Sequence, residues 1–198
     1  MAKKEKGKTV ADKRVRELLD FHVGMLGSKK NKLEFDEREK AYYLKDVPWS
    51  AEDDYFRIGY NMRKRFISRT FDLVFSTTIN DVDFNGSFDL RLKFTGFPNV
   101  KTAYFKAGKG KQKYEKYFND EKLLATLRKY ASIVDIGYIV IEYNEPAGRL
   151  KIKVCPYPGA YLWIIFPPVF YKIPLKDGEM EALWNATMEL RKFVCKRY

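Results

Sequence analysis

The most apolar stretch of the chain is residues 160–166, which two prolines, Pro167 and Pro168, follow at once. Aromatic and β-branched residues dominate it, and such residues favour strands. Its apolar residues run without interruption instead of alternating with polar ones, which is typical of a strand covered on both faces. We therefore expect residues 160–166 to form a strand at the centre of a sheet.

Apolar and polar residues alternate in several other segments, and this period of two predicts further strands. The dipeptide Asn85-Gly86 separates two of these segments and predicts a tight hairpin turn, and Gly148 marks a second turn. The expected strands cover residues 71–79, 88–94, 100–106, 136–143 and 149–155.

Helical periodicity appears in other parts of the chain. The clearest case is the C-terminal segment 179–197, in which apolar residues recur every three or four positions. We favour helices as well for the ambiguous segment 33–46, and for a segment that begins with a capping pattern at Ser50 and Asp53. The expected helices cover residues 9–26, 33–46, 51–69, 119–130 and 179–197.

These elements predict an α+β protein with an antiparallel sheet of about six strands, helices mainly on one face and a long C-terminal helix. Their order also suggests a pseudo-repeat of the form α-βββ-α-βββ-α. Residues 1–8 form a lysine-rich tail, expected to be disordered, and residues 9–198 are expected to form one domain, in which segment 9–48 is possible as a separate appendage.

The chain is strongly basic, with 38 Lys and Arg against 26 Asp and Glu, a formal net charge of +12. Such a charge implies an anionic partner or simply solubility. Cys155 and Cys195 show no paired spacing, so reduced thiols are expected. No signal peptide or membrane-spanning segment is evident, and we therefore expect a cytoplasmic protein.

Two clusters of cations contain few or no acidic residues and are the candidate anion-binding residues. One lies in segment 51–69 and the other in the glycine- and lysine-rich loop 106–113, which Tyr114 follows. Aromatic rings interleaved with lysines suit single-stranded nucleic acid, because bases stack on the rings and phosphates contact the cations. A helix C-terminus that favours cations, or a merely solvated loop, explains part of the same pattern. The chosen residues are Arg63, Lys64, Arg65, Lys109, Lys111, Lys113 and Tyr114.

No segment carries a complete catalytic or cofactor motif, so we expect no enzyme activity and no cofactor. Asp81, Asp83 and Asn85 match the first half of a calcium loop, but Leu92 stands where the closing glutamate belongs. A turn that binds no metal is therefore the favoured interpretation. His22, the single histidine, falls on the apolar face of its helix and is expected to be a core residue.

The sequence thus favours a non-enzymatic binding or adaptor protein with a basic surface, and nucleic acid is the leading anionic partner. Two alternatives remain open. One is a protein-interaction module that forms a homodimer through a sheet face or edge. The other is a small-molecule binder with a pocket between the sheet and the C-terminal helix, which Trp163 and Trp184 would line.

Overall fold

The computed structural model describes residues 10–44, 46–48, 54–96, 102–108 and 113–196. The helices and strands follow in this order: α1 (Val10–Gly24), η1 (Gly27–Lys32), β1 (Leu33–Asp36), β2 (Ala41–Leu44), β3 (Tyr55–Lys64), β4 (Ser68–Ile79), β5 (Phe88–Thr95), β6 (Thr102–Ala107), α2 (Lys113–Phe118), α3 (Glu121–Ala131), β7 (Ile136–Asn144), η2 (Glu145–Ala147), β8 (Arg149–Pro156), β9 (Tyr161–Ile164), β10 (Val169–Lys172) and α4 (Glu179–Cys195).

All described strands belong to one antiparallel sheet of ten strands, in the order β1-β2-β3-β4-β8-β7-β5-β6, with β9 and β10 added beside β4. The α+β class and the antiparallel sheet are confirmed, but the expected number of about six strands is too small. Six strands precede α2 and four follow α3, so the structure does not show the expected pseudo-repeat.

The additional strands come from two segments that we expected to be helical. Residues 33–46 contain the β1–β2 hairpin, and β3 occupies most of segment 51–69. In β3 the side chains of Phe56, Ile58 and Tyr60 alternate into the core, and all ten residues of the strand pair with β4. This long pairing decides the conformation, because the apolar positions of the segment fit both a period of two and a helical period.

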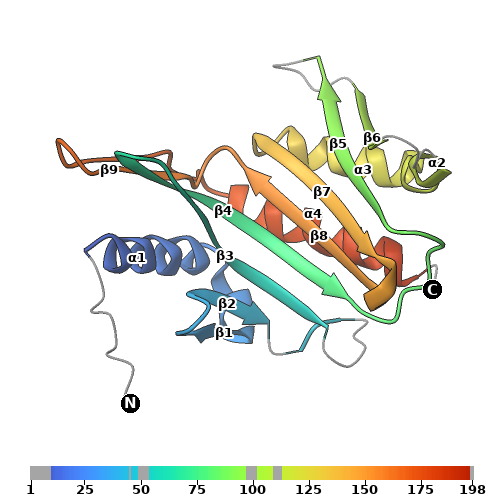
Figure 1. The fold of residues 1–198 in the computed structure, drawn as a ribbon, viewed down its shortest axis with the longest axis horizontal. Helices are drawn as coiled ribbons and strands as arrows, with labels where there is room; N and C mark the ends of the chain where they lie inside the picture. The colour runs from blue at the N-terminus through green and yellow to red at the C-terminus, as the bar shows by residue number, and fades with distance from the viewer. Residues whose placement is uncertain (1–9, 45, 49–53, 97–101, 109–112, 197–198) are drawn as a thin grey trace.

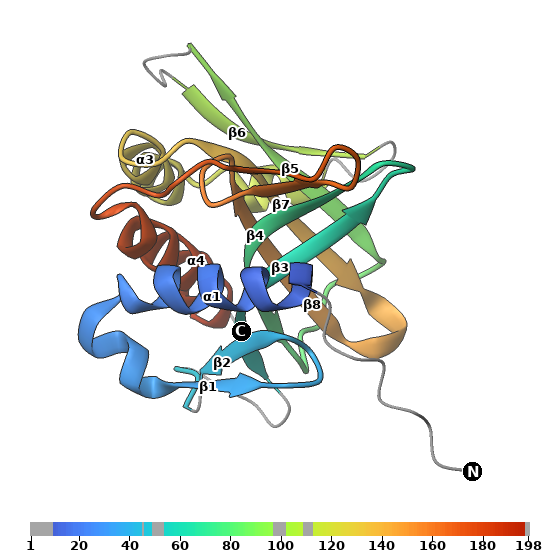
Figure 2. The same cartoon turned by 90° about the vertical axis from the view of Figure 1, so that its left-hand side faces the viewer.

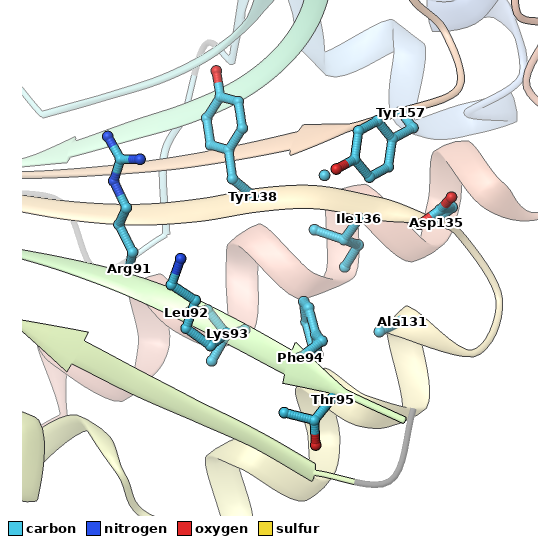
Figure 3. Close-up of a pocket in the computed structure, with 11 residues that line it drawn as sticks. Arg91, Leu92, Lys93, Phe94, Thr95, Ala131, Asp135, Ile136, Tyr138 and Tyr157 are labelled. Carbon is cyan, nitrogen blue, oxygen red and sulfur yellow. The ribbon is translucent and has the colours of Figure 1, made fainter. Parts of the chain in front are cut away.

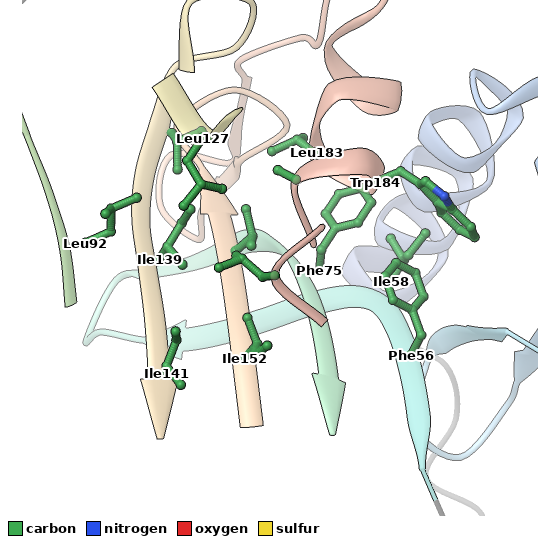
Figure 4. Close-up of a cluster of buried hydrophobic side chains, with 14 of the residues drawn as sticks. Phe56, Ile58, Phe75, Leu92, Leu127, Ile139, Ile141, Ile152, Leu183 and Trp184 are labelled. Carbon is green, nitrogen blue, oxygen red and sulfur yellow. The ribbon is translucent and has the colours of Figure 1, made fainter. Parts of the chain in front are cut away.

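The helices α1, α3 and α4 lie on one face of the sheet, as Figures 1 and 2 show. The predicted C-terminal helix is confirmed as α4, and the core lies between it and the sheet (Figure 4). There the ring of Trp184 contacts Phe56 at a centroid distance of 4.7 Å. The apolar side of α1, including Leu19 and Val23, joins the same core.

The expectation that residues 160–166 form the central strand is wrong. β9 covers only Tyr161–Ile164, and the next two residues are largely exposed, Ile165 at 47% and Phe166 at 82%. The central positions belong to β4, β8 and β7 instead. In β4 every residue from Leu73 to Ile79 is buried, so this central strand is covered on both faces although its sequence contains Ser76, Thr77 and Thr78.

The expected hairpin around Asn85-Gly86 is also wrong, because β8 and β7 separate β4 from β5 in the sheet. Residues 80–87 instead cross from one strand to the other. The Tyr143 hydroxyl donates to the Val82 carbonyl oxygen at 2.7 Å, and Phe84 is buried at 3% exposure. The hairpins β5–β6 and β7–β8 were predicted correctly. The predicted helix 119–130 is confirmed as α3, and the Asp120 side chain caps its N-terminus by accepting from the Leu123 amide.

A buried ion pair connects α4 to the sheet. The side chains of Arg191 and Asp54 form it, and both are 0% exposed. Arg191 also donates to the carbonyl oxygens of Pro48 and Thr78 and to the hydroxyl of Thr77, at 2.8–3.0 Å. These bonds supply acceptors for the guanidinium and connect one side chain of α4 to three separate segments of the chain.

We expect the substitution Arg191→Met to lower the free energy of unfolding by about 3–5 kcal/mol, because it leaves the Asp54 carboxylate buried without its cation. The measurement is urea unfolding monitored by circular dichroism. Lys192→Met is the matched control, since the Lys192 side chain is 35% exposed and forms a surface ion pair with Glu189. The control should stay within about 0.5 kcal/mol of the parent. Equal unfolding midpoints for the two variants would contradict this role of the pair.

His22 is a core residue, as expected, with 3% of its surface exposed. Its Nδ1 lies 3.1 Å from the hydroxyl of Tyr60 on β3. Burial, together with the positive charge of Lys172, lowers the pKa of His22 from 6.5 to about 4. The imidazole is therefore neutral in the folded protein at neutral pH.

Protonation of His22 should destabilise the protein in mildly acidic solution. The folded-state pKa lies below the ordinary value, so the unfolded chain binds more protons between pH 6.5 and 4. The contribution of His22 to stability is complete above pH 6.5 and declines by about 3 kcal/mol as the pH falls to 4. His22→Asn keeps a polar partner for Tyr60 but cannot titrate. Unfolding free energies of parent and variant, measured from pH 7 to 4, should converge as the pH falls; a constant difference would refute the assignment.

Candidate functional site

The structure separates the residues that we selected from the sequence. Arg63, Lys64 and Arg65 lie at the end of the β3–β4 hairpin, and Lys113 begins α2, near the opposite end of the sheet (Figure 1). Lys109 and Lys111 lie outside the described residues. The described parts of the two clusters therefore do not form one patch. The helix that was expected to carry the first cluster is β3.

Tyr114 is a core residue in this structure and offers no free ring face. Only 7% of its surface is exposed, and its ring stacks on Phe88 at a centroid distance of 4.2 Å. Its hydroxyl donates to the carbonyl oxygen of Asn85. The Nζ atom of Lys113 lies 4.8 Å from the ring centroid. Tyr114 therefore holds α2 against β5, a role that the loop composition did not reveal.

The sheet face opposite the helices brings together a different set of cations. Among the described helices, none packs on this face (Figure 2). One row of paired residues crosses it from β6 to β3: Lys106, Arg91, Val140, Lys153, Ser76 and Arg57. We call this surface the open face. Its cations are Arg57, Arg63, Arg91, Lys93, Lys106, Arg149, Lys151 and Lys153, and its acids are Glu34, Asp36, Asp72, Asp89 and Glu142.

Two of these cations are already paired within the open face. Arg63 makes a two-pronged contact with Asp72, at 2.7 and 2.9 Å, and Lys153 contacts Glu142 at 2.7 Å. By contrast, the part of the chain that the structure describes gives no ion pair to Arg91, Lys93, Lys106 or Lys151. Between the charged side chains lie the short, buried side chains of Val74, Ser76 and Thr78. The unpaired cations thus concentrate on β5, β6 and β8.

A cleft opens at one end of this face, where β5 and β7 diverge. The two strands pair only from Phe88 with Tyr143 to Arg91 with Val140, and beyond this point each follows its other neighbour. The gap holds a cavity of about 420 Å³. Residues from both strands line it, together with the last residue of α3, the residue before β7 and the residue after β8 (Figure 3): Arg91, Leu92, Lys93, Phe94, Thr95, Ala131, Asp135, Ile136, Gly137, Tyr138 and Tyr157.

Charged and aromatic side chains meet on the open-face side of this cleft. Arg91, Tyr138 and Tyr157 extend to the same side of the sheet in Figure 3, with Tyr138 at 36% and Tyr157 at 60% exposure. A Cβ at Gly137 would lie 3.2 Å from the Cys155 carbonyl oxygen, a tight contact, and 3.5 Å from the ring of Tyr157, an ordinary one. Asp135 lies at the far end and is the acidic group of the lining.

The buried thiol of Cys155, a residue that pairs with Tyr138 in the sheet, is not activated for nucleophilic chemistry. Burial raises the pKa of Cys155 to about 11, so the thiol is protonated at neutral pH. Burial, and then the hydrogen bond with Cys155, raises the pKa of Tyr138, whose hydroxyl therefore also stays protonated. Both groups are suited to donating hydrogen bonds. Within the described residues, neither Cys155 nor Cys195 forms a disulfide.

The segment with Asp81, Asp83 and Asn85, which matches the first half of a calcium loop, forms part of the connection between β4 and β5. Asp81 has a positive φ of 57°, and the Gly86 amide donates to Glu145 Oε1 at 2.7 Å. Across the residues with described positions, no three His, Cys, Asp or Glu side chains gather in a way that would hold a metal ion.

The sequence contained a signal for the open face that our choice of residues missed. In β5 and β8, cations alternate with buried apolar residues, as in Leu90-Arg91-Leu92-Lys93 and Leu150-Lys151-Ile152-Lys153. Such alternation places all cations of a strand on the face away from the core. Searching each predicted strand for charge on alternate positions would have found this surface; searching for contiguous clusters did not.

These features define an α+β protein whose antiparallel sheet packs under helices on one face and exposes a cation-rich second face. Within the described ranges, no helix combines the length and apolar composition needed to cross a bilayer. The chain belongs to the family DUF3156, described as a protein of unknown function, whose model matches residues 34–194. No curated protein and no solved structure matches the chain.

Proposed function

We propose that this protein is a non-enzymatic binding protein that holds single-stranded nucleic acid across its open face. The observation that carries this proposal is the row of cations that runs across the strands, from Lys106 and Arg91 to Lys153 and Arg57. The row crosses five steps between neighbouring strands, a span of about 24 Å. A phosphate backbone lying along it would meet cations at four of its six positions, including both ends.

Exposed tyrosines support a single-stranded partner. Tyr104, Tyr138 and Tyr157 lie on or beside the row, with 42%, 36% and 60% of their surfaces exposed. Bases stack on aromatic rings only when they are not already stacked in a duplex, and this contact tolerates any sequence. The β5–β7 cleft, at about 420 Å³, is large enough to receive one base or one nucleotide at the edge of the row.

Reversing the free charges on the open face should weaken binding of a labelled single-stranded oligonucleotide. The variant Arg91→Glu/Lys93→Glu/Lys106→Glu removes three phosphate contacts, which lowers the salt dependence of log K by about 2. Fluorescence anisotropy across a salt series measures both the affinity and this slope. The matched control is Lys116→Glu/Lys122→Glu/Lys129→Glu, which reverses three exposed lysines on α2 and α3 and gives the same net charge.

The two triple variants separate a site from a general effect of charge. The proposal expects the control to keep most of the parent affinity and slope. Equal losses in both variants, or no binding by the parent at low salt, would contradict the proposal. A parent that binds a duplex more tightly than a single strand would contradict the single-stranded form of it.

A tyrosine substitution tests the stacking contribution. Tyr157→Ala should weaken binding at all salt concentrations without changing the salt slope, because it removes a ring and no charge. The expected loss corresponds to about 1–3 kcal/mol. Tyr157 is 60% exposed, so thermal unfolding of the variant should match the parent. A loss that disappears at low salt would indicate a charge effect and would exclude stacking at this ring.

A second candidate function, supported by the cleft alone, is binding of a phosphorylated small molecule. Arg91, Lys93 and two tyrosines suit a phosphate joined to an aromatic ring. This cleft lies between β5 and β7, whereas the space between the sheet and α4 is filled by core side chains such as Trp184 (Figure 4). A mononucleotide that binds with an affinity equal to that of the oligonucleotide would favour this candidate.

A further inference from the structure

Two hairpins pair side by side and form an arm that extends from the body of the protein (Figure 1). The end of the β3–β4 hairpin supplies one half, and the β9–β10 hairpin supplies the other. β4 pairs with β9 from Ser68 with Ile164 to Phe71 with Tyr161, and the Ile165 amide donates to the Ile67 carbonyl oxygen at 2.8 Å. The two hairpin ends are therefore held together and face the same way.

The end of the arm is apolar and exposed. A hydrogen bond from the Arg65 amide to the Ser68 carbonyl oxygen closes the first hairpin and leaves Phe66 and Ile67 outside it, at 100% and 53% exposure. In the second hairpin Ile165 and Phe166 are 47% and 82% exposed. We call these residues, together with Pro167 and Pro168, the apolar tip. Neighbouring large apolar side chains at such exposure mark a surface that another phase or molecule covers.

Cations and large aromatic rings follow directly behind the apolar tip. Lys64 pairs with Arg69, Arg69 with Trp163, and Trp163 with Phe170, which forms one row across the arm. Arg65 lies beside this row at the hairpin turn. Lys64, Arg65 and Arg69 are the basic collar of the arm. No Asp or Glu occurs in segments 61–71 and 160–176, which contain the whole arm.

We propose that this arm inserts its apolar tip into the surface of an anionic phospholipid bilayer. Apolar side chains at the end, aromatic rings behind them and cations alongside match the layers of a membrane, from acyl chains to interface to anionic headgroups. Because the tip lies at one end of the molecule, both hairpins reach the same plane without any change of fold. The protein would then be a peripheral membrane protein, attached by this arm.

Other occupants fit the arm less well. A second copy of the chain would bring two acid-free basic collars together, and like charges at close range repel. Nucleic acid would satisfy the collar but not Ile67 and Ile165, since aliphatic side chains do not offer a stacking face. An acidic bilayer is the partner that satisfies both the apolar tip and the collar.

Vesicle co-sedimentation tests the proposal directly. The parent should bind vesicles of phosphatidylcholine mixed with phosphatidylserine and bind those of phosphatidylcholine alone much more weakly. Phe66→Ser/Phe166→Ser should weaken partitioning about tenfold or more. Lys64→Gln/Arg65→Gln/Arg69→Gln should weaken it by about fivefold per cation, and only on the anionic vesicles.

Matched controls place the same chemical changes elsewhere on the surface. Ile133→Ser removes an exposed apolar residue, 47% exposed, after α3, and Lys116→Gln/Lys122→Gln/Lys129→Gln removes three exposed lysines. Both controls should bind like the parent. Phe66→Trp adds a reporter, and lipids brominated on the acyl chains should quench it beyond the quenching of the parent's own tryptophans.

Several results would overturn the proposal. These are absence of binding to anionic vesicles, equal binding by the tip variant and the parent, or no additional quenching of Phe66→Trp. A tip variant that instead abolishes a dimer in sedimentation equilibrium would assign the arm to self-association. A collar variant that loses oligonucleotide binding but retains vesicle binding would assign it to nucleic acid. The open-face variants contain none of these residues, so each proposal can fail separately.

Discussion

The buried ion pair between Arg191 and Asp54 is the constraint on which the arrangement of sheet and helices depends. A guanidinium with no exposed surface is costly unless every donor finds an acceptor. Here the acceptors are Pro48 and Asp54, which precede β3, and Thr77 and Thr78 of β4. Any shift of α4 along the sheet would break several of these bonds at once, so the pair fixes the position of the helix, whereas the apolar contacts of Trp184 and Leu183 alone would tolerate sliding. The described helices α1, α3 and α4 all pack on the same face of the sheet.

The open face is a consequence of this one-sided packing. Strands β5 and β8 bury alternate apolar residues under α3 and α4, and the residues between them must then face away from the helices. No helix packs on this second face among the described helices, so its long side chains are not constrained by helix packing. Several of its cations have no carboxylate partner among the described residues. Mutual repulsion of such cations is a cost to stability that an anionic ligand would remove. An anionic ligand bound to this face, as proposed above, would therefore stabilise the folded protein.

Local patterns predicted those parts of the fold in which neighbours in sequence are neighbours in space. The helix α4, the helix α3 and the hairpins β5–β6 and β7–β8 belong to this group. The failures occurred where the apolar periodicity fits both a helix and a strand, and where strands that are distant in the sequence pair with each other. Segment 55–64 fits a helix through Tyr55, Ile58 and Met62 and a strand through Phe56, Ile58 and Tyr60, and only its pairing with β4 settles the choice. The order β4-β8-β7-β5 could not be predicted from Asn85-Gly86, because a turn sequence does not show whether the two strands that flank it pair with each other. For the candidate site, the sequence indicated positive charge but placed it in contiguous clusters, one of which divides between the arm and the open face.

The misassigned stretch 160–166 shows what an apolar run implies when the core is already complete. The central strands β4, β8 and β7 fill the space under α4 with their own side chains, so the β9–β10 hairpin finds burial only for Tyr161 and a few neighbours. Phe66, Ile67, Ile165 and Phe166 contribute little to folding free energy in water, since burial is the source of the hydrophobic gain. Their exposure also carries a risk of aggregation, which the adjoining acid-free cations reduce by repulsion. These exposed apolar residues therefore fit the proposed insertion into a bilayer better than a role in folding. The cations that repel a second copy of the chain in water would attract the arm to an acidic bilayer.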